Sequence, residues 1–268
     1  MVRIGTVWDR TVDVLKGRAN ILVPIAVASL FLPSVANTAL AAFGPGGSGV
    51  VALLGTVVAF AVLLANIWGQ LAMLAVATHP ATTRADAGRQ ATARLLPALG
   101  VILAMAVLFA LALVPPVGAM MNAGIDLTSG TVSVQSLPPG VSGFIGLYSL
   151  ALLVVAFVIG ARLILLNPVI LNERRGLGAV MRSFRLTRGL TLKIVGVMVL
   201  FAIVLLVPMM AIQAVVGLIA RLILGADAQP AIGFLAGTAG AAVTSLFSVV
   251  AAAFTAQLYV AVADDRAG

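Results

Sequence analysis

Long apolar runs alternate with short polar segments along the whole chain. Six of the runs are long enough to cross a membrane as helices, because a hydrocarbon core of about 30 Å needs roughly 20 helical residues. They cover residues 20–42, 49–78, 98–121, 143–171, 194–221 and 231–262. Backbone N–H and C=O groups cannot stay unpaired in lipid, and the sequence lacks the short alternating segments of a membrane β-barrel. We therefore predict an all-α, polytopic integral membrane protein with six transmembrane helices.

The apolar runs recur as three copies of one unit. The tripeptides Gly69-Gln70-Leu71, Ala161-Arg162-Leu163 and Ala256-Gln257-Leu258 each lie late in a run, and their middle residues are 92 and 95 residues apart. Self-similarity of this kind indicates that each copy is one supersecondary unit. We predict a single six-helix domain over residues 1–268, built from three hairpin repeats at about 3–79, 80–171 and 172–264.

A polar segment with helical periodicity precedes each hairpin. In residues 173–189, Leu177, Val180, Met181 and Phe184 recur at the spacing of one helix face, and five arginines occupy other positions of this segment. Residues 3–18 show the same design, and residues 82–96 a weaker version. Basic amphipathic helices lie at membrane surfaces, so we predict an interfacial helix before each hairpin. The alternative is that these segments are solvated cytoplasmic loops.

Four prolines mark the odd-numbered spans. Pro33, Pro115, Pro116 and Pro208 fall near the ends of those spans that are predicted to lie outside the cell. Proline removes a backbone donor and collides with the carbonyl four residues earlier. We therefore expect these spans to bend or end there.

Composition and charge support a membrane protein with a defined orientation. Hydrophobic residues make up 62% of the chain and charged residues only 9%, which excludes an ordinary soluble domain. The net charge of +8 is carried mainly by the segments before spans one, three and five, whereas the opposite connections, residues 43–48, 122–142 and 222–230, contain no Lys or Arg. This is the positive-inside pattern and predicts that both termini are cytoplasmic. It gives no support for nucleic acid as a partner.

Arg162 is the strongest candidate for a functional residue within a span. It precedes Glu173 by 11 residues, or about 16 Å of helix, and a charge at that depth marks a functional site by default. Its equivalents in the other copies are Gln70 and Gln257. If the copies surround an axis, the three side chains could converge on a phosphate or a carboxylate. The alternative is that Arg162 reaches the cytoplasmic interface or pairs with an amide or a helix-end carbonyl.

Residue combinations that carry out catalysis are absent from the sequence. The chain has no cysteine and one histidine, His79, and its eight acidic residues do not cluster at metal-ligand spacing. There is no glycine-rich phosphate loop and no serine near a histidine in the sequence. We predict a non-enzymatic protein without catalytic residues, metal or cofactor.

One segment carries a family resemblance. A span ending in Asn167-Pro168, then the acidic Glu173, then Ser183-Phe184-Arg185-Leu186-Thr187-Arg188-Gly189 resembles the membrane domain of glycerophosphoryl diester phosphodiesterases and the related YciC-type inner-membrane proteins. The resemblance implies a six-helix protein of the bacterial inner membrane without the soluble catalytic barrel of two-domain relatives. No catalytic residue carries over from it, and the role of Ser183–Gly189 stays open.

Two functions from different classes follow. The first is a non-enzymatic inner-membrane protein that engages anionic lipid headgroups, or a membrane partner, through its basic interfacial helices. The alternative is a carrier for small solutes or lipids, including a flippase-like one, with a polar site at Arg162. A dry, tightly packed interior would count against transport. The candidate anion or lipid ligands are Arg162, Gln70, Gln257, Arg174, Arg175, Arg182, Arg185 and Arg188.

Overall fold

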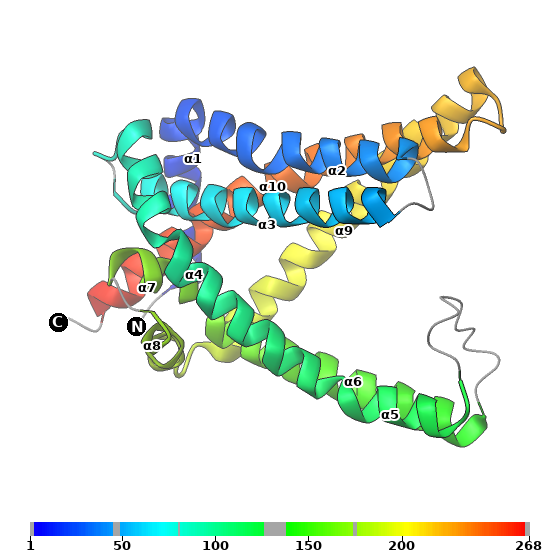
Figure 1. Ribbon diagram of the computed structural model, residues 1–268. Coiled ribbons are helices and arrows are strands. Elements are labelled where there is room, and N and C mark those ends of the chain that lie inside the picture. Colours follow the sequence, from blue (N-terminus) through cyan, green and yellow to red (C-terminus); the bar gives the residue numbers. More distant parts are fainter. Residues whose placement is uncertain (1–2, 45–48, 80, 126–137, 174–175, 266–268) are drawn as a thin grey trace.

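The fold is seen in a computed structural model that describes residues 3–44, 49–79, 81–125, 138–173 and 176–265. These residues form helices joined by turns (Figure 1). In chain order the elements are α1 (Ile4–Ala26), the π-helical turn η1 (Val27–Phe31), α2 (Leu32–Phe43), α3 (Gly49–Thr78), α4 (Arg84–Ala112), α5 (Val114–Asn122), α6 (Pro139–Leu163), α7 (Leu166–Asn172), α8 (Gly178–Leu186), α9 (Thr191–Leu224) and α10 (Gln229–Asp265).

Six stretches of the described residues are long and apolar enough to cross a membrane. They are Ile4–Phe43, Leu53–Thr78, Arg84–Asn122, Pro139–Asn172, Thr191–Leu224 and Gln229–Asp265. Each contains most of one predicted apolar run. The prediction of an all-helical chain with six such helices is therefore confirmed over the described residues. The grouping of these helices into three equivalent repeats stays a prediction.

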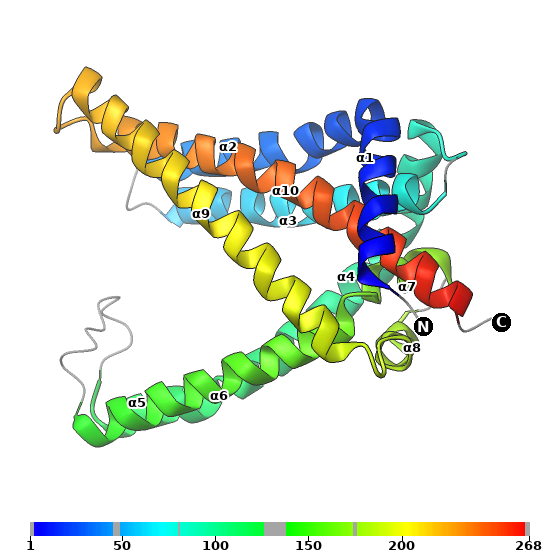
Figure 2. The same cartoon turned by 180° about the vertical axis from the view of Figure 1, so that it is seen from behind.

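The long helices form two groups that meet at one end of the molecule. Helices α2, α3 and α10 run in a common direction, while α4, α5 and α6 extend away from them as a separate arm (Figure 1). Within this arm, the Tyr148 hydroxyl of α6 donates a hydrogen bond to the Ala112 carbonyl of α4 at 2.6 Å. Helix α9 leads from the base of the arm to the far end of α10 (Figure 2). Both chain termini lie at the end where the groups meet, beside α7 and α8 (Figure 1).

The prolines act on the spans in three different ways. Before Pro33 the helix widens into η1, where the Leu32 N–H bonds the carbonyl five residues back, at Val27. This wider turn accommodates the proline ring, which would collide with the Ser29 carbonyl in a regular helix. Helix α4 ends before Pro115 and Pro116, which stand in the first turn of α5. Pro208 lies inside a continuous α9, so it ends no helix.

The three predicted interfacial segments do not form three separate helices. Residues 3–18 and 82–96 are the first parts of α1 and α4, which continue into the spans without interruption. The ribbon of α1 nevertheless changes direction before it joins α2 (Figure 2). Only α8 stands alone: it begins at Gly178, after the bend at Gly176, and Gly189, with a φ of 86°, lies in the turn that follows it. The surface location of all three segments stays a prediction.

The predicted fourth span, residues 143–171, is not one regular helix. Helix α6 ends at Leu163, a turn follows at Ile164 and Leu165, and the chain resumes as α7. Pro168 explains the break, because it cannot donate to the Ile164 carbonyl but is tolerated in the first turn of a new helix. The stretch Pro139–Asn172 is long and apolar enough to cross a membrane, as predicted, but it consists of two helices and not one.

The packed core lies at the end where the two groups of helices meet. It combines the last turns of α3, almost all of α7 and the second half of α10, with buried side chains such as Leu74, Ile170 and Leu258. Toward the other end, large apolar side chains of α4, α6 and α9 are exposed, as lipid-facing residues are expected to be. The polar side chains at the packed end are therefore held in place by the buried residues around them.

Candidate functional site

Helix α8 is fastened to the break between α6 and α7. The end of α6 leaves carbonyls without a helical partner. The Ser183 hydroxyl donates to the Arg162 carbonyl at 2.6 Å, and the Thr187 hydroxyl lies 3.4 Å from the same oxygen and 2.9 Å from the Ser183 carbonyl. Ser183 and Thr187 are fully buried. The motif Ser183–Gly189 therefore has a structural role, since it holds α8 against the end of α6.

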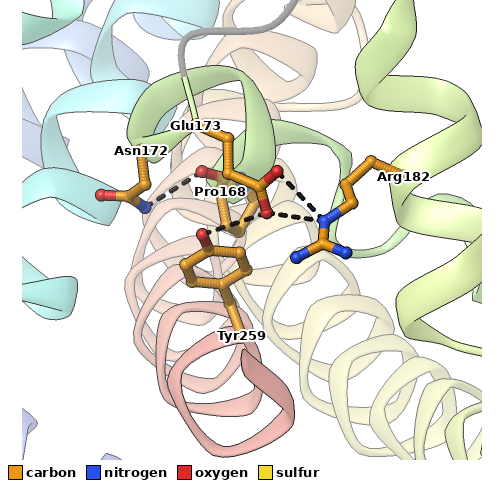
Figure 3. A network of polar contacts seen from close by, with 5 residues as sticks. All are labelled: Pro168, Asn172, Glu173, Arg182 and Tyr259. Atoms are coloured by element: carbon orange, nitrogen blue, oxygen red, sulfur yellow. Dashed lines mark hydrogen bonds and ion pairs between the residues drawn. The ribbon is translucent and has the colours of Figure 1, made fainter. Parts of the chain in front are cut away.

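A carboxylate-centred network joins α8 to α7 and α10 (Figure 3). The Arg182 Nε donates to both Glu173 carboxylate oxygens, at 2.9 and 3.1 Å, and the Tyr259 hydroxyl lies 3.5 Å from one of them. The Asn172 amide donates to the Pro168 carbonyl at 3.0 Å, within the last turn of α7. Side-chain exposure is 36% for Arg182 and 17% for Glu173, so the pair is partly shielded from solvent.

Two further polar contacts close the end of α3. The Gln257 amide of α10 donates to the Ala77 carbonyl at 2.7 Å, and Gln257 is buried. The His79 Nε2 lies 3.2 Å from the Asn172 side-chain oxygen. The Gln257 bond satisfies a carbonyl near the end of α3 that would otherwise be buried without a partner, whereas the contact between His79 and Asn172 is exposed. Helices α3, α7, α8 and α10 are thereby connected through polar groups as well as through packing.

The three residues predicted to share one polar level have separate surroundings. The Arg162 guanidinium lies over the Phe184 ring, with its Cζ 5.6 Å from the ring centre. The Gln257 amide donates to the Ala77 carbonyl near the end of α3, and Gln70 is half-buried on α3. Among the described residues, no hydrogen bond or ion pair connects these three side chains. Their convergence on an anion stays a prediction, and the Phe184 ring that Arg162 contacts is not among the partners expected for this side chain.

The faces of α8 differ from the single apolar stripe expected from the sequence. Its buried face consists of Ala179, Ser183 and Leu186. Of the predicted stripe, Val180 and Phe184 are half-buried, whereas Leu177 and Met181 are 68% and 62% exposed. Two arginines, at positions 185 and 188, are also exposed.

These four exposed residues lie on one face of α8 and its C-terminal turn. Leu177, Met181, Arg185 and Arg188 follow one another at intervals of four, four and three residues. We call them the α8 surface stripe. Helix α8 is viewed nearly end-on where α3, α6 and α10 run across the picture (Figures 1 and 2). The stripe therefore runs across the direction of the spans, as a helix in the membrane surface would.

The predicted cationic ligands divide into three sets. Arg185 and Arg188 are exposed in the α8 surface stripe. Arg182 is committed to Glu173, and Arg162 to the Phe184 ring. Arg174 and Arg175 lie outside the described residues. The exposed set places positive charge on the surface of α8.

Sequence reasoning missed the residues that position α8. Glu173 entered only as a marker for the depth of Arg162 and within the family resemblance, and Tyr259 and Asn172 were not singled out. A usable signal existed, since Glu173 is an acidic residue among arginines and stands nine residues before Arg182. The contribution of Tyr259 from α10, 86 residues further along the chain, had no comparable signal.

Comparisons with known proteins add nothing to the interpretation of these contacts. Protein-family models, curated proteins and solved structures gave no match to the chain. The features available for a functional conclusion are the fixed position of α8, its exposed stripe and the packed end of the bundle.

Proposed function

We propose that this chain is a non-enzymatic protein of the bacterial inner membrane that binds anionic lipid headgroups through its basic surface segments, chiefly α8. The resemblance of residues 167–189 to inner-membrane proteins supports this location. The α8 surface stripe is the observation on which the proposal rests. It combines two exposed apolar side chains with two exposed guanidinium groups on one face.

The chemistry of the stripe matches a membrane surface. Leu177 and Met181 are suited to the boundary between headgroups and acyl chains, where interfacial helices bury their apolar side. Arg185 and Arg188 are suited to the phosphates, and each basic residue near an anionic surface contributes about 1 kcal/mol. A helix that binds in this way must be held with its axis across the direction of the spans. The bond from Ser183 to the Arg162 carbonyl and the pair between Arg182 and Glu173 supply that support.

The proposed orientation places α8 and both termini on the cytoplasmic side. Charge supports it, because the connections expected at the opposite end contain no Lys or Arg. The termini lie beside α7 and α8, which agrees with one common cytoplasmic end (Figure 1). Anionic lipids of the inner leaflet would then face the stripe directly.

The transport alternative has weaker support. A carrier needs a polar site near the middle of its spans. Arg162 instead stacks on Phe184, and its carbonyl is bonded by Ser183. Two of the cavities bordered by α10, one beside η1 and one beside α9, have predominantly apolar linings.

The experiment compares lipid retention in charge variants. Protein is reconstituted in nanodiscs with equal amounts of phosphatidylglycerol and phosphatidylcholine, and bound lipids are counted by native mass spectrometry. Removing both stripe charges with Arg185→Gln and Arg188→Gln should reduce the preference for phosphatidylglycerol about 30-fold, the effect of roughly 2 kcal/mol. Arg221, an exposed arginine in the last turn of α9, provides the single-charge control: Arg221→Gln should reduce the preference by no more than about fivefold.

Two results would contradict the proposal. One is an unchanged lipid preference in the double variant. The other is that the double variant loses a co-purifying membrane protein while its lipid profile stays the same, which would make the stripe a partner surface instead.

A further inference from the structure

A groove of about 250 Å³ lies between α9 and α10, near the base of the α6 arm. Its lining is apolar except for one threonine. It consists of Trp8, Ile164, Val197, Met198, Phe201, Ala202, Leu205, Ala251, Phe254 and Thr255. A surface of this composition cannot hold a charged or strongly polar solute, because nothing in it pairs with such groups. It suits a hydrocarbon.

The length of the groove matches one membrane leaflet. Along α9 its floor is set by Val197, Phe201 and Leu205, which lie on one helix face at intervals of four residues. Eight residues of helix correspond to about 12 Å. One leaflet contributes about 15 Å, half of a hydrocarbon core of about 30 Å. The groove can therefore follow an acyl chain through most of a single leaflet.

One end of the groove carries the features of a headgroup region. Lys193 precedes Val197 by four residues, so it lies one turn beyond the groove on the same face of α9, and it is exposed. Helix α9 contains no acidic residue that would neutralise this lysine. Trp8 borders the groove, is 48% exposed, and has its ring 6.5 Å from that of Phe254. Tryptophan at a partly exposed position is typical of the membrane interface.

We propose that this groove holds one acyl chain of an anionic phospholipid whose phosphate lies at Lys193. Charge complementarity selects an anionic lipid over a zwitterionic one, and the apolar lining selects a lipid over a free phosphate. The inference rests on the proposed function in one respect, the attraction of anionic lipid to this end of the molecule. The site itself is separate from the α8 surface stripe.

The two tryptophans of the chain allow a direct test. Trp68→Phe leaves Trp8 as the only tryptophan. This protein is reconstituted in phosphatidylcholine bilayers containing either phosphatidylglycerol or phosphatidylcholine with brominated acyl chains at the same mole fraction. Bromine quenches tryptophan at contact distance. Trp8 should sense brominated phosphatidylglycerol with about fivefold preference, the selectivity of one basic group at an anionic lipid.

Two substitutions separate the chain site from the headgroup site. Ala202→Leu fills the groove and should lower quenching by both lipids, whereas Ala211→Leu, at an exposed position on α9, should not. Lys193→Gln should remove the preference for phosphatidylglycerol and leave quenching by phosphatidylcholine in place. Because Lys193 is exposed, this variant tests the site even if Ala202→Leu fails to fold.

The proposal is overturned if Trp8 is quenched equally by the two lipids before substitution, or if Ala202→Leu has the same effect as Ala211→Leu. It is also overturned if neither lipid quenches Trp8, the result expected when a partner helix fills the groove. The Arg185→Gln and Arg188→Gln double variant distinguishes the two proposals. It should change the total retention of phosphatidylglycerol while leaving the lipid preference at Trp8 in place.

Discussion

Ser183 shows how one hydroxyl compensates for a broken helix. Its bond to the Arg162 carbonyl, at 2.6 Å, satisfies an acceptor that is exposed by the end of α6 and then covered by α8. The Thr187 hydroxyl lies 3.4 Å from the same oxygen and also bonds the Ser183 carbonyl. A buried acceptor without a partner is destabilising by about 1–3 kcal/mol, so the native fold depends on this residue.

We predict that Ser183→Ala lowers the free energy of unfolding by about 1–2 kcal/mol. The measurement is the loss of monodisperse protein during stepwise heating in detergent. Ser142→Ala is the matched control, because the Ser142 hydroxyl makes the same kind of bond, to the Pro139 carbonyl at 3.0 Å, at an exposed position. Water replaces that bond, so its loss should have little effect. Equal thermal stability of the two variants would contradict the assigned role of Ser183.

The candidate site was predictable in residue types but not in residue pairings. The concentration of arginine in residues 173–189 identified the segment, and hydrophobic spacing identified its helix. The spacing did not show that Leu177 and Met181 are exposed while Ala179 and Ser183 are buried. Burial depends on which neighbouring helix covers the segment, and that is a long-range property that helical periodicity alone does not contain.

At the scale of elements, Gly69 allows α3 to approach the π-helical turn η1 closely, because glycine has no side chain. A Cβ at Gly69 would overlap the Ser29 hydroxyl. Ser29 is buried and bonds the Ile25 carbonyl at 2.7 Å, so it cannot easily move away. Gly55, on the same helix, has open space around it. Gly69 is therefore needed for close packing of α3 against η1, whereas Gly55 is not.

We predict opposite signs for alanine at these two positions. Gly69→Ala should destabilise the protein by about 1–3 kcal/mol through overpacking. Gly55→Ala should stabilise it by up to about 1 kcal/mol, because alanine is the better helix former. Thermal unfolding in one detergent compares both variants with the parent protein. A Gly69→Ala variant as stable as Gly55→Ala would show that α3 and η1 do not pack as described.

Hydropathy predicted the elements well, and local chain chemistry explains where it failed. All six apolar runs correspond to helices able to span a membrane. The break at Ile164 and Leu165 escaped a hydropathy reading because both flanking segments are apolar, although Pro168 was visible in the sequence. Conversely, the boundaries expected near residues 18 and 96 are not helix ends, since α1 and α4 continue through them, whereas a turn at Gly189 and Leu190 separates α8 from α9.

At the scale of the whole molecule, orientation is the property that the proposed function needs most. The absence of cysteine from the chain makes it testable with single-cysteine variants. Asp227 lies in the exposed connection between α9 and α10, and Gln90 is exposed on the first part of α4.

We predict that Asp227→Cys reacts with a membrane-impermeant maleimide in intact spheroplasts, whereas Gln90→Cys reacts only after lysis. The reason is the positive-inside distribution of Lys and Arg. Labelling is read by the mass shift of the purified protein, with the cysteine-free parent as the blank. The reverse pattern would place α8 outside the cell and exclude binding to inner-leaflet lipids.

The contact between the first and last helices has a consequence for synthesis. Helix α10 packs against α1, α2, α3 and α9, and its most apolar window is 50% buried, compared with 6% for α9. Its Gln257 also bonds α3, at Ala77, across 180 residues of sequence. Chains emerge from the ribosome N-terminus first. The helices that precede α10, up to Leu224, must therefore wait in the membrane with their packing surface open, and the bundle closes only when α10 arrives.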